Sequence, residues 1–304
     1  MSLIPKEAVE RFTKAGYRIV GNHSAVDICH WTKESLRSGR VCFKEKWYGI
    51  KSHRCLEMTP SLIWCTHRCK FCWRPLEFTK NAEPKSDDPK EIVEECIEQR
   101  RLLLTGFKGF SKVDKKKWEE AAIPTNAAIS LAGEPTLYPR ISDLLKEFHK
   151  RNMTTFLVTN GTRPDRLKSL DEEPTNLYIS LCSPDKTTYK KVHNPLIKDG
   201  WERLNESLEL MKSFKCRKVI RLTLVKGLSM KNPEKYAEMI LKAEPDFCEV
   251  KAFMHVGESQ KRLSYDSMPT TEDVRNFAKE LSEKTGYKIK DEDIPSRVML
   301  LEKV

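Results

Sequence analysis

Cys65-Thr66-His67-Arg68-Cys69-Lys70-Phe71-Cys72 is the stretch that decides the fold. It places three cysteines within eight residues, in a C-x3-C-x2-C pattern, directly after the short apolar segment 61–64. That segment has the pattern of a buried strand that leads into a loop. Three thiolates are one ligand short of the four that a structural zinc site or a four-cysteine iron–sulfur cluster uses. The pattern therefore predicts a metal centre with one position open for chemistry.

A zinc site is the alternative for this loop, with His67 or a distant cysteine as the fourth ligand. Zinc sites usually combine two C-x2-C pairs, and the sequence has no second pair of this kind. His67 lies inside the loop and would have to fold back onto its own neighbours to reach the metal. The spacing, and the aromatic Phe71 before the last cysteine, instead resemble the radical S-adenosylmethionine (SAM) superfamily. The resemblance implies a [4Fe-4S] cluster on Cys65, Cys69 and Cys72, with SAM on the fourth iron.

The composition favours a cytoplasmic enzyme over a secreted or membrane protein. With 304 residues the chain is long enough for one large α/β domain, and it contains no internal repeat. Ten cysteines would suit disulfides in a much smaller secreted chain. The N-terminus has no apolar signal core, and no run approaches the roughly 18 apolar residues of a membrane span. We therefore expect a cytoplasmic protein with reduced thiols.

The charge favours a polyanionic partner. Lys and Arg outnumber Asp and Glu by 55 to 44, which gives a net charge of +11. Such an excess is typical of proteins that bind nucleic acid. Lysines that only solvate the surface of a basic enzyme are the alternative, and charge by itself does not separate the two.

A second cysteine set precedes the loop. Cys29, Cys42 and Cys55 follow a C-x12-C-x12-C pattern, with aromatic and basic residues between them. Gaps of this length let each cysteine sit on its own helix or loop and meet the others only in the folded state. Three unrelated buried cysteines are the alternative, because free cysteine is among the most buried residue types. The equal spacing and the closeness to the loop favour an auxiliary [4Fe-4S] cluster that is also one ligand short. The remaining cysteines are expected in the core: Cys96, Cys182, Cys216 and Cys248.

From residue 126 onward, strands and helices alternate with the rhythm of β/α units. We expect parallel strands at residues 61–64, 127–131, 155–158, 177–181, 219–225 and 248–253. We expect helices at residues 90–104, 141–152, 164–170, 199–214, 233–243 and 271–284, and the segment 298–301 as either a last strand or a lid. Six parallel strands predict an α/β fold, a partial (β/α)6 TIM-like barrel of the radical SAM kind. The barrel would span residues 61–304, with a basic insertion near 105–120 and a C-terminal extension, after a cysteine-rich, cluster-binding N-terminal extension over residues 1–60.

The ends of the predicted strands carry the candidate cofactor-binding residues, because parallel barrels place their chemistry at the C-terminal ends of their strands. Gly133-Glu134-Pro135 resembles the GGE-P motif of the radical SAM family, with Ala132 in place of the first glycine. The resemblance implies that Gly133 and Glu134 bind the amino group of the SAM methionine, and an ordinary turn is the alternative. Asn160 and Ser180 are candidates for the adenosine end of SAM, although polar residues at strand ends also form turns.

The N-terminal half narrows the resemblance to one branch of the superfamily. The two cysteine sets, the run 44–50 and the sequence Phe71-Cys72-Trp73-Arg74 are similar to the archaeal 4-demethylwyosine synthases over essentially the whole chain. These enzymes modify tRNA in wyosine and wybutosine biosynthesis. The resemblance implies a carbon–carbon lyase that condenses N1-methylguanosine-37 of tRNA(Phe) with pyruvate to form the tricyclic 4-demethylwyosine base.

The resemblance also implies the course of the reaction. The cluster on the C-x3-C-x2-C loop cleaves SAM to methionine and a 5′-deoxyadenosyl radical, which takes a hydrogen from the N1-methyl group. The resulting carbon radical adds to pyruvate, whose carboxyl carbon is lost before the ring closes. The auxiliary cluster would bind pyruvate at its open iron.

Lys44 is the candidate for a Schiff base with the pyruvate carbonyl, and Lys46 is the second choice. An amine attacks a carbonyl only when it is neutral, and the nearby cations Lys46 and Arg40, together with burial beside a cluster, would favour that form. A solvated lysine without a catalytic role is the alternative.

The stretch 106–118 is the candidate contact with RNA. It interleaves lysines with aromatic residues, which combines attraction for phosphates with faces for base stacking. The lysines are Lys108, Lys112, Lys115, Lys116 and Lys117, and the aromatics are Phe107, Phe110 and Trp118. A solvated loop is the alternative. A second candidate patch consists of Lys186, Lys190, Lys191 and His193.

Two other functions stay open at this point. One is a different two-cluster radical SAM enzyme that modifies RNA, such as a methylthiotransferase, which would be expected to carry an added recognition domain. The other is a non-catalytic, zinc-containing RNA-binding module, which would have no use for the Gly133-Glu134-Pro135 turn. The sequence shows no flavodoxin-like extension, so we expect an external electron donor of the flavodoxin or ferredoxin type. We also expect a monomer.

Overall fold

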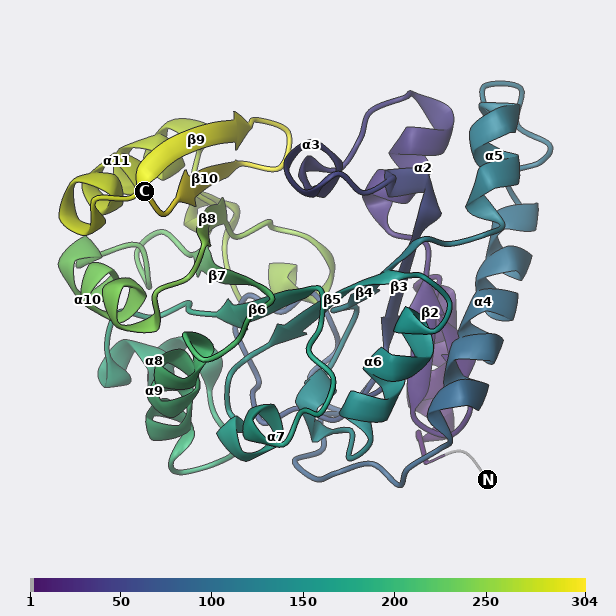
Figure 1. Ribbon diagram of the computed structural model, residues 1–304, viewed down its shortest axis with the longest axis horizontal. Coiled ribbons are helices and arrows are strands. Elements are labelled where there is room, and N and C mark those ends of the chain that lie inside the picture. Colours follow the sequence, from purple (N-terminus) through teal and green to yellow (C-terminus); the bar gives the residue numbers. More distant parts are fainter. Residues whose placement is uncertain (1–2) are drawn as a thin grey trace. The chain divides into compact units, whose positions relative to one another are not determined.

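The computed structural model describes residues 3–304 (Figure 1). The chain forms two compact units. The first contains the chain up to Trp64 together with Ala82–Leu157 and Leu170–Thr175, and the second contains Cys65–Asn81, Val158–Ser169 and Asn176–Val304. Within residues 3–304, none of the helices combines the length and the apolar character needed to cross a membrane.

The first unit is built on a mixed sheet. Strands β1, β2 and β3 pair antiparallel, and β3, β4 and β5 pair parallel. The strands are β1 (Arg18–Val20), β2 (Ser24–Asp27), β3 (Cys55–Thr59), β4 (Asn126–Ile129) and β5 (Thr154–Thr159), of which the last two residues are counted with the second unit. The helices are α1 (Lys6–Lys14), α2 (His30–Arg37), α3 (Phe43–Tyr48), α4 (Pro89–Thr105), α5 (Lys115–Ala121) and α6 (Ile141–His149), with short 3-10 helices at η1 (Ser52–Arg54) and η2 (Pro135–Leu137).

Helix α4 shows how the local sequence sets the start of an element. Pro89 occupies the first turn, and the carboxylate of Asp88 accepts a hydrogen bond from the backbone N–H of Lys90. One face of the helix is buried, including Ile92 and Val93. The helix predicted at residues 90–104 is therefore confirmed.

The strand predicted at residues 61–64 is wrong. These residues are buried, but they form a turn in which the backbone N–H of Trp64 donates to the carbonyl of Ser61 at 3.1 Å. A short apolar run does not distinguish a buried strand from a buried turn, because it is too short to show a period. The strand that precedes the loop is β3, where the charged Glu57 interrupts the apolar pattern. It pairs parallel with β4 and takes the place of the predicted first strand.

Arg100 on α4 ties three segments of the first unit together. Its side chain is fully buried, and its guanidinium donates to the carbonyls of Cys55 at 3.0 Å, of His53 at 2.7 Å and of Ala121. No carboxylate pairs with it among residues 3–304. Burial lowers the pKa of Arg100 to about 10, whereas the nearby thiols of Cys55 and Cys29 act to raise it. Arg100 therefore fixes the start of β3, where Cys55 lies.

The variant Arg100→Met is expected to lose about 3 kcal/mol or more of unfolding free energy, because the buried carbonyls lose hydrogen bonds from a charged donor. Thermal unfolding followed by circular dichroism should show a midpoint lower by on the order of 10 °C. Arg101→Met is the matched control, since the exposed Arg101 is the next residue of the same helix. Equal midpoints for the two variants would contradict the structural role of Arg100.

The second unit is built on a sheet with three parallel strands and an antiparallel edge. Strands β6, β7 and β8 pair parallel, β10 pairs antiparallel with β8, and β9 pairs antiparallel with β10. The strands are β6 (Asn176–Ser180), β7 (Arg217–Leu224), β8 (Phe247–Ala252), β9 (Lys288–Asp293) and β10 (Val298–Glu302). The helices are α7 (Pro164–Lys168), α8 (Lys186–His193), α9 (Gly200–Met211), α10 (Pro233–Ala243) and α11 (Thr271–Thr285), with 3-10 helices at η3 (Gly257–Lys261) and η4 (Tyr265–Ser267).

The other predicted elements are present, with shifted ends except for α10 (Pro233–Ala243), whose bounds are those predicted. Strands β4 to β8 correspond to the predicted strands after the first, and helices α6, α7, α9, α10 and α11 correspond to the predicted helices. The segment 298–301 belongs to strand β10 and is not a lid. Helix α8 and the edge strand β9 were not predicted. The exposed and half-buried sequence of β9, Lys-Ile-Lys-Asp-Glu-Asp, explains why no strand was expected there.

Candidate metal and cofactor site

The loop with Cys65, Cys69 and Cys72 lies in the second unit and is held by main-chain hydrogen bonds. The N–H of Arg68 donates to the carbonyl of His193, and the N–H of Lys70 donates to the carbonyl of Val192, both at 2.9 Å. The loop therefore runs along the last residues of α8. These bonds satisfy the backbone of a loop that has no helix or strand of its own.

The three thiols of the loop lie within electrostatic reach of one another. Loss of solvent raises the pKa of the Cys69 thiol well above its ordinary value, and the neighbouring Cys65 and Cys72 raise it further. A site that penalises three thiolates in this way is relieved when a cation binds them. The donor set fits a metal centre with three cysteine ligands.

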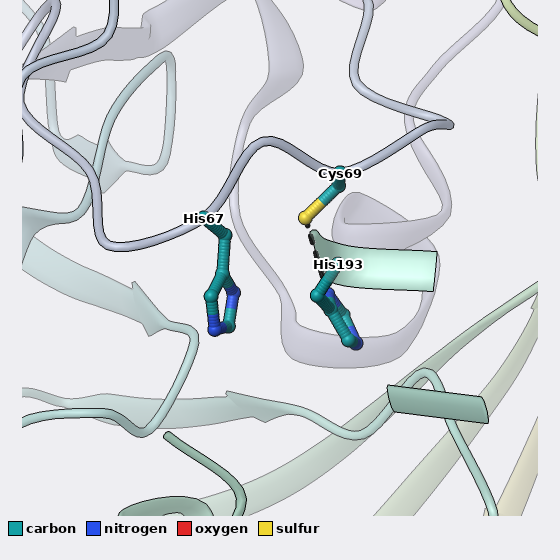
Figure 2. Close-up of side chains that lie close together, drawn as sticks. All are labelled: His67, Cys69 and His193. Atoms are coloured by element: carbon teal, nitrogen blue, oxygen red, sulfur yellow. Dashed lines mark hydrogen bonds between the residues drawn. The ribbon is translucent and has the colours of Figure 1, made fainter. Parts of the chain in front are cut away.

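Two histidines adjoin Cys69 (Figure 2). The Nδ1 atom of His193 lies 3.1 Å from the Sγ atom of Cys69, and one nitrogen of His67 completes a group of donor atoms within 4.8 Å of one another. Burial lowers the pKa of His193 to about 3, so its ring is neutral and carries one N–H. When Cys69 is a metal-bound thiolate it has no proton to donate, so the Nδ1–H of His193 must be the donor.

His67 has a hydrogen-bond partner of its own outside the three-cysteine set. Its Nε2 atom lies 2.5 Å from the hydroxyl of Tyr189, and its ring is buried. Burial lowers the pKa of His67 well below its ordinary value. Within residues 3–304 the Nδ1 atom of His67 has no hydrogen-bond partner, so Cys69 with the two histidines also forms a donor set that zinc would accept. Geometry by itself admits both kinds of metal centre at this loop.

Sequence reasoning assigned His193 to an RNA-facing patch and missed its contact with Cys69. The patch assignment is wrong for this residue, because His193 is buried. The two residues are separated by 124 positions, and no local pattern connects them. Of the other members of that patch, Lys186, Lys190 and Lys191 are exposed on α8.

The residues proposed for the adenosine end of SAM lie at strand ends, as expected. The side-chain amide of Asn160 donates to the hydroxyl oxygen of Thr66 at 3.0 Å and approaches the Sγ atom of Cys65 at 3.8 Å. Ser180 is the last residue of β6 and is half-buried. The structure therefore brings Asn160 to the cysteine loop.

The Gly133-Glu134-Pro135 turn lies in the first unit. Gly133 has a φ of +67°, and a Cβ atom there would lie 1.6 Å from the carbonyl oxygen of Ser61. Only glycine fits this position, because both the conformation and the space exclude a side chain. The backbone N–H of Glu134 donates to the carbonyl of Trp64 at 2.8 Å, and its carboxylate accepts from the hydroxyl of Thr136 at 2.6 Å. The turn thus fixes the residue that precedes Cys65.

The second cysteine set comes together in the first unit. Cys29 and Cys42 are the residues before α2 and α3, and Cys55 is the first residue of β3. Burial raises the pKa of Cys29 well above its ordinary value, and Cys55 and Cys42 contribute to the rise. Burial also raises the pKa of Cys55 to about 12. Each cysteine sits on its own element and the three thiols interact, which fits a second centre with three cysteine ligands.

Of the four cysteines predicted to lie in the core, three are buried and one is not. Cys96, Cys182 and Cys248 are buried in the core, as predicted. Cys216 is only half-buried.

Lys44 faces the second cysteine set from α3. Its side chain is buried, and its Nζ atom lies 4.5 Å from the centre of the Phe156 ring. Its charge reaches both Cys55 and Glu57, where it lowers the pKa. The second choice, Lys46, is exposed and lies two positions further along the helix, so it points in a different direction.

Sequence reasoning missed Glu57 as a neighbour of Lys44. Glu57 faces Asp27 in register across β2 and β3, and like charges in such a position are unfavourable. Burial raises the pKa of Glu57 to about 7, and Asp27 raises it further. A charged residue in an otherwise apolar strand is the signal that could have identified it. By contrast, Arg40, the predicted neighbour of Lys44, is exposed and pairs with Glu34.

The predicted RNA contact consists of a turn and helix α5 in the first unit. Lys108, Lys112, Lys115 and Lys116 are exposed, whereas the Nζ atom of Lys117 lies 3.4 Å from the carbonyl of Ser35. Phe107 is buried and Trp118 packs against the same apolar cluster, so the two rings do not offer the stacking faces that the sequence suggested. Phe110 is exposed and can stack on a base.

Two family models match the chain. The one described as radical SAM superfamily matches residues 60–240, and the one described as wyosine base formation matches residues 242–303. A protein of Pyrococcus horikoshii, named S-adenosyl-L-methionine-dependent tRNA 4-demethylwyosine synthase, is 57% identical over 304 residues. The match covers 98% of this chain and 89% of the relative.

Two solved structures are similar over almost the whole chain. One is described as TYW1 with a lysine-pyruvate adduct bound, and it matches with a TM-score of 0.91 at 38% identity. The other is a crystal structure of archaeal TYW1, with a TM-score of 0.82 at 35% identity. Each match covers 99% of this chain and 96% of the other.

Proposed function

Because the chain belongs to the family of S-adenosyl-L-methionine-dependent tRNA 4-demethylwyosine synthases, we propose that it condenses N1-methylguanosine-37 of tRNA(Phe) with pyruvate. Its fold is the predicted α/β fold of the radical SAM superfamily, which implies SAM and an iron–sulfur cluster as cofactors. The substrate is a tRNA. We further propose that the modified nucleotide is N1-methylguanosine-37, that the second substrate is pyruvate and that the reaction is that of a carbon–carbon lyase.

The placement of Lys44 carries the proposal. Lys44 is a buried lysine whose charge reaches Cys55, one of three interacting thiols that begin three separate elements. A structural relative that spans the same length holds a lysine–pyruvate adduct. Lys44 is the lysine of this chain that we assign to that adduct. We assign the set of Cys29, Cys42 and Cys55 to an N-terminal extension, residues 1–60. The set of Cys65, Cys69 and Cys72 belongs to the barrel, residues 61–304.

We assign a cluster to each cysteine set. Cys65, Cys69 and Cys72 would hold the cluster that supplies the electron for the cleavage of SAM, and Cys29, Cys42 and Cys55 would hold an auxiliary cluster with one iron open to pyruvate. Around the first set, Asn160 orients the start of the loop through Thr66. Gly133 and Glu134 are assigned to the methionine end of SAM, and Asn160 and Ser180 to the adenosine end.

Lys44 acts on pyruvate by ordinary imine chemistry. Its neutral amine adds to the keto carbon, and the carbinolamine loses water to give a Schiff base. After C2 has joined the N1-methyl carbon and the carboxyl carbon has been lost, the exocyclic amine of the guanine replaces the lysine amine at C2, which closes the ring and returns the free lysine. Burial of Lys44 keeps bulk water from the imine between these steps. The lysines at 108–117 are assigned to contacts with the RNA backbone. The electron donor is a protein of the flavodoxin or ferredoxin type. The enzyme acts as a cytoplasmic monomer.

The test is an anaerobic assay of the iron-reconstituted protein with SAM, dithionite, pyruvate and a tRNA(Phe) transcript methylated at N1 of guanosine-37. Nuclease digestion and mass spectrometry are expected to show 4-demethylwyosine, with carbon-13 from C2 and C3 of pyruvate in the base and none from C1. Reactions without pyruvate should retain N1-methylguanosine. Cleavage of SAM without any change in the base would contradict the proposed substrates.

A further inference from the structure

A basic pocket of about 600 Å³ opens beside the cysteine loop in the second unit. Its lining includes one carboxylate, Glu77. The cations of its lining are Arg68, Lys70, Lys190, Lys191 and Arg262. A cavity of this size and charge accepts a ligand with several negative groups.

The pocket is built by the same contacts that hold the loop. Arg68 and Lys70 flank Cys69 in the sequence, and their backbone N–H groups bond to the last residues of α8. Lys190 and Lys191 lie in the last turn of that helix. The guanidinium of Arg262 donates to the carbonyl of Lys70 at 3.2 Å and to the carbonyl of Cys72. The cations therefore converge because the loop folds.

The cations of the pocket are not neutralised. None of the five pairs with a carboxylate in the part of the chain that the structure describes, residues 3–304. Lysines elsewhere in this unit do have such partners: Lys168 pairs with Glu206, Lys226 with Asp273 and Lys242 with Glu209. Placing five like charges around one cavity is unfavourable unless an anion enters it.

We propose that this pocket binds backbone phosphates of the substrate tRNA and holds the RNA beside the cysteine loop. The proposal rests on the tRNA substrate of the proposed function. A phosphate diester gives each cation an acceptor, and arginine can engage it with two parallel N–H bonds. A base that must leave the anticodon loop to react needs its backbone held close by, and residues on both sides of Cys69 supply that hold.

The test compares two double variants that remove the same charge. Lys190→Gln/Lys191→Gln changes two exposed residues of the pocket, and Lys168→Gln/Lys242→Gln changes two lysines that have carboxylate partners. Fluorescence anisotropy with the iron-reconstituted protein measures the Kd for methylated tRNA(Phe) at several KCl concentrations. The pocket variant is expected to bind about tenfold or more weaker at about 0.15 M salt, with a salt slope lower by about 1 to 2. The control is expected to match the unaltered protein.

Further measurements separate the possible failures. Lys190→Arg/Lys191→Arg is expected to retain both affinity and slope, because it keeps the charge. Equal binding by the Gln variant and the control would overturn the pocket assignment and leave the proposed function standing. A Gln variant that loses affinity for inorganic pyrophosphate but not for tRNA would overturn it as well, since the pocket would then serve a small anion. Failure of the unaltered protein to bind the tRNA would overturn both proposals.

Discussion

Lys44→Arg is expected to abolish formation of 4-demethylwyosine while iron content and SAM cleavage persist. Arginine keeps the positive charge beside Cys55 and the contact with the Phe156 ring, but its guanidinium does not form a Schiff base. Loss of a covalent nucleophile should lower the rate of product formation by about 10⁴-fold or more. Borohydride treatment in the presence of pyruvate, followed by peptide mass spectrometry, should find the reduced adduct on Lys44 in the unaltered protein and none in the variant.

Lys46→Arg separates the two lysines of helix α3. If Lys46 is the nucleophile, this variant loses the borohydride-trapped adduct and Lys44→Arg keeps it. An active enzyme in which neither lysine is trapped would remove the Schiff base from the proposal.

Replacement of Cys29, Cys42 and Cys55 by alanine is expected to remove one cluster and leave the other. The unaltered protein, reconstituted anaerobically, should contain about eight irons and the triple variant about four. The variant should still cleave SAM, because the loop from Cys65 to Cys72 belongs to the second unit and is held by contacts within it. It should form no tricyclic base, since the proposed pyruvate site is lost.

The reciprocal variant and a control complete this experiment. Alanine at Cys65, Cys69 and Cys72 should also leave about four irons, but SAM cleavage should be absent. Cys216→Ala, at a half-buried cysteine outside both sets, should keep about eight. About four irons in the unaltered protein would mean a single cluster and would remove the auxiliary site from the proposal.

Features that depend on neighbours in the sequence were accessible from the sequence. The three cysteines of the loop lie within eight residues, so their spacing predicts a shared metal centre without knowledge of the fold. The limits of helix α10 were predicted as observed, because Pro233 marks its first turn. Gly133 could be identified as part of a local Gly-Glu-Pro motif, whereas the carbonyls that exclude a side chain there belong to Ser61 and Trp64 and appear only in the structure.

Features that depend on distant segments appeared only in the tertiary structure. His193 meets Cys69 across 124 positions, Glu57 faces Asp27 through the register of two strands, and Arg100 bonds to the start of β3 from helix α4. The turn at 61–64 has the same apolar composition as a strand, and the pairing of β3 with β4 decides which segment enters the sheet. A local sequence pattern indicates the backbone conformation of a segment and which of its faces is buried. The contacts between distant segments depend instead on strand register and on which charged groups form pairs. The basic pocket illustrates the difference: the sequence contains its five cations, but only the fold places them around one cavity, where none of them pairs with a carboxylate of residues 3–304.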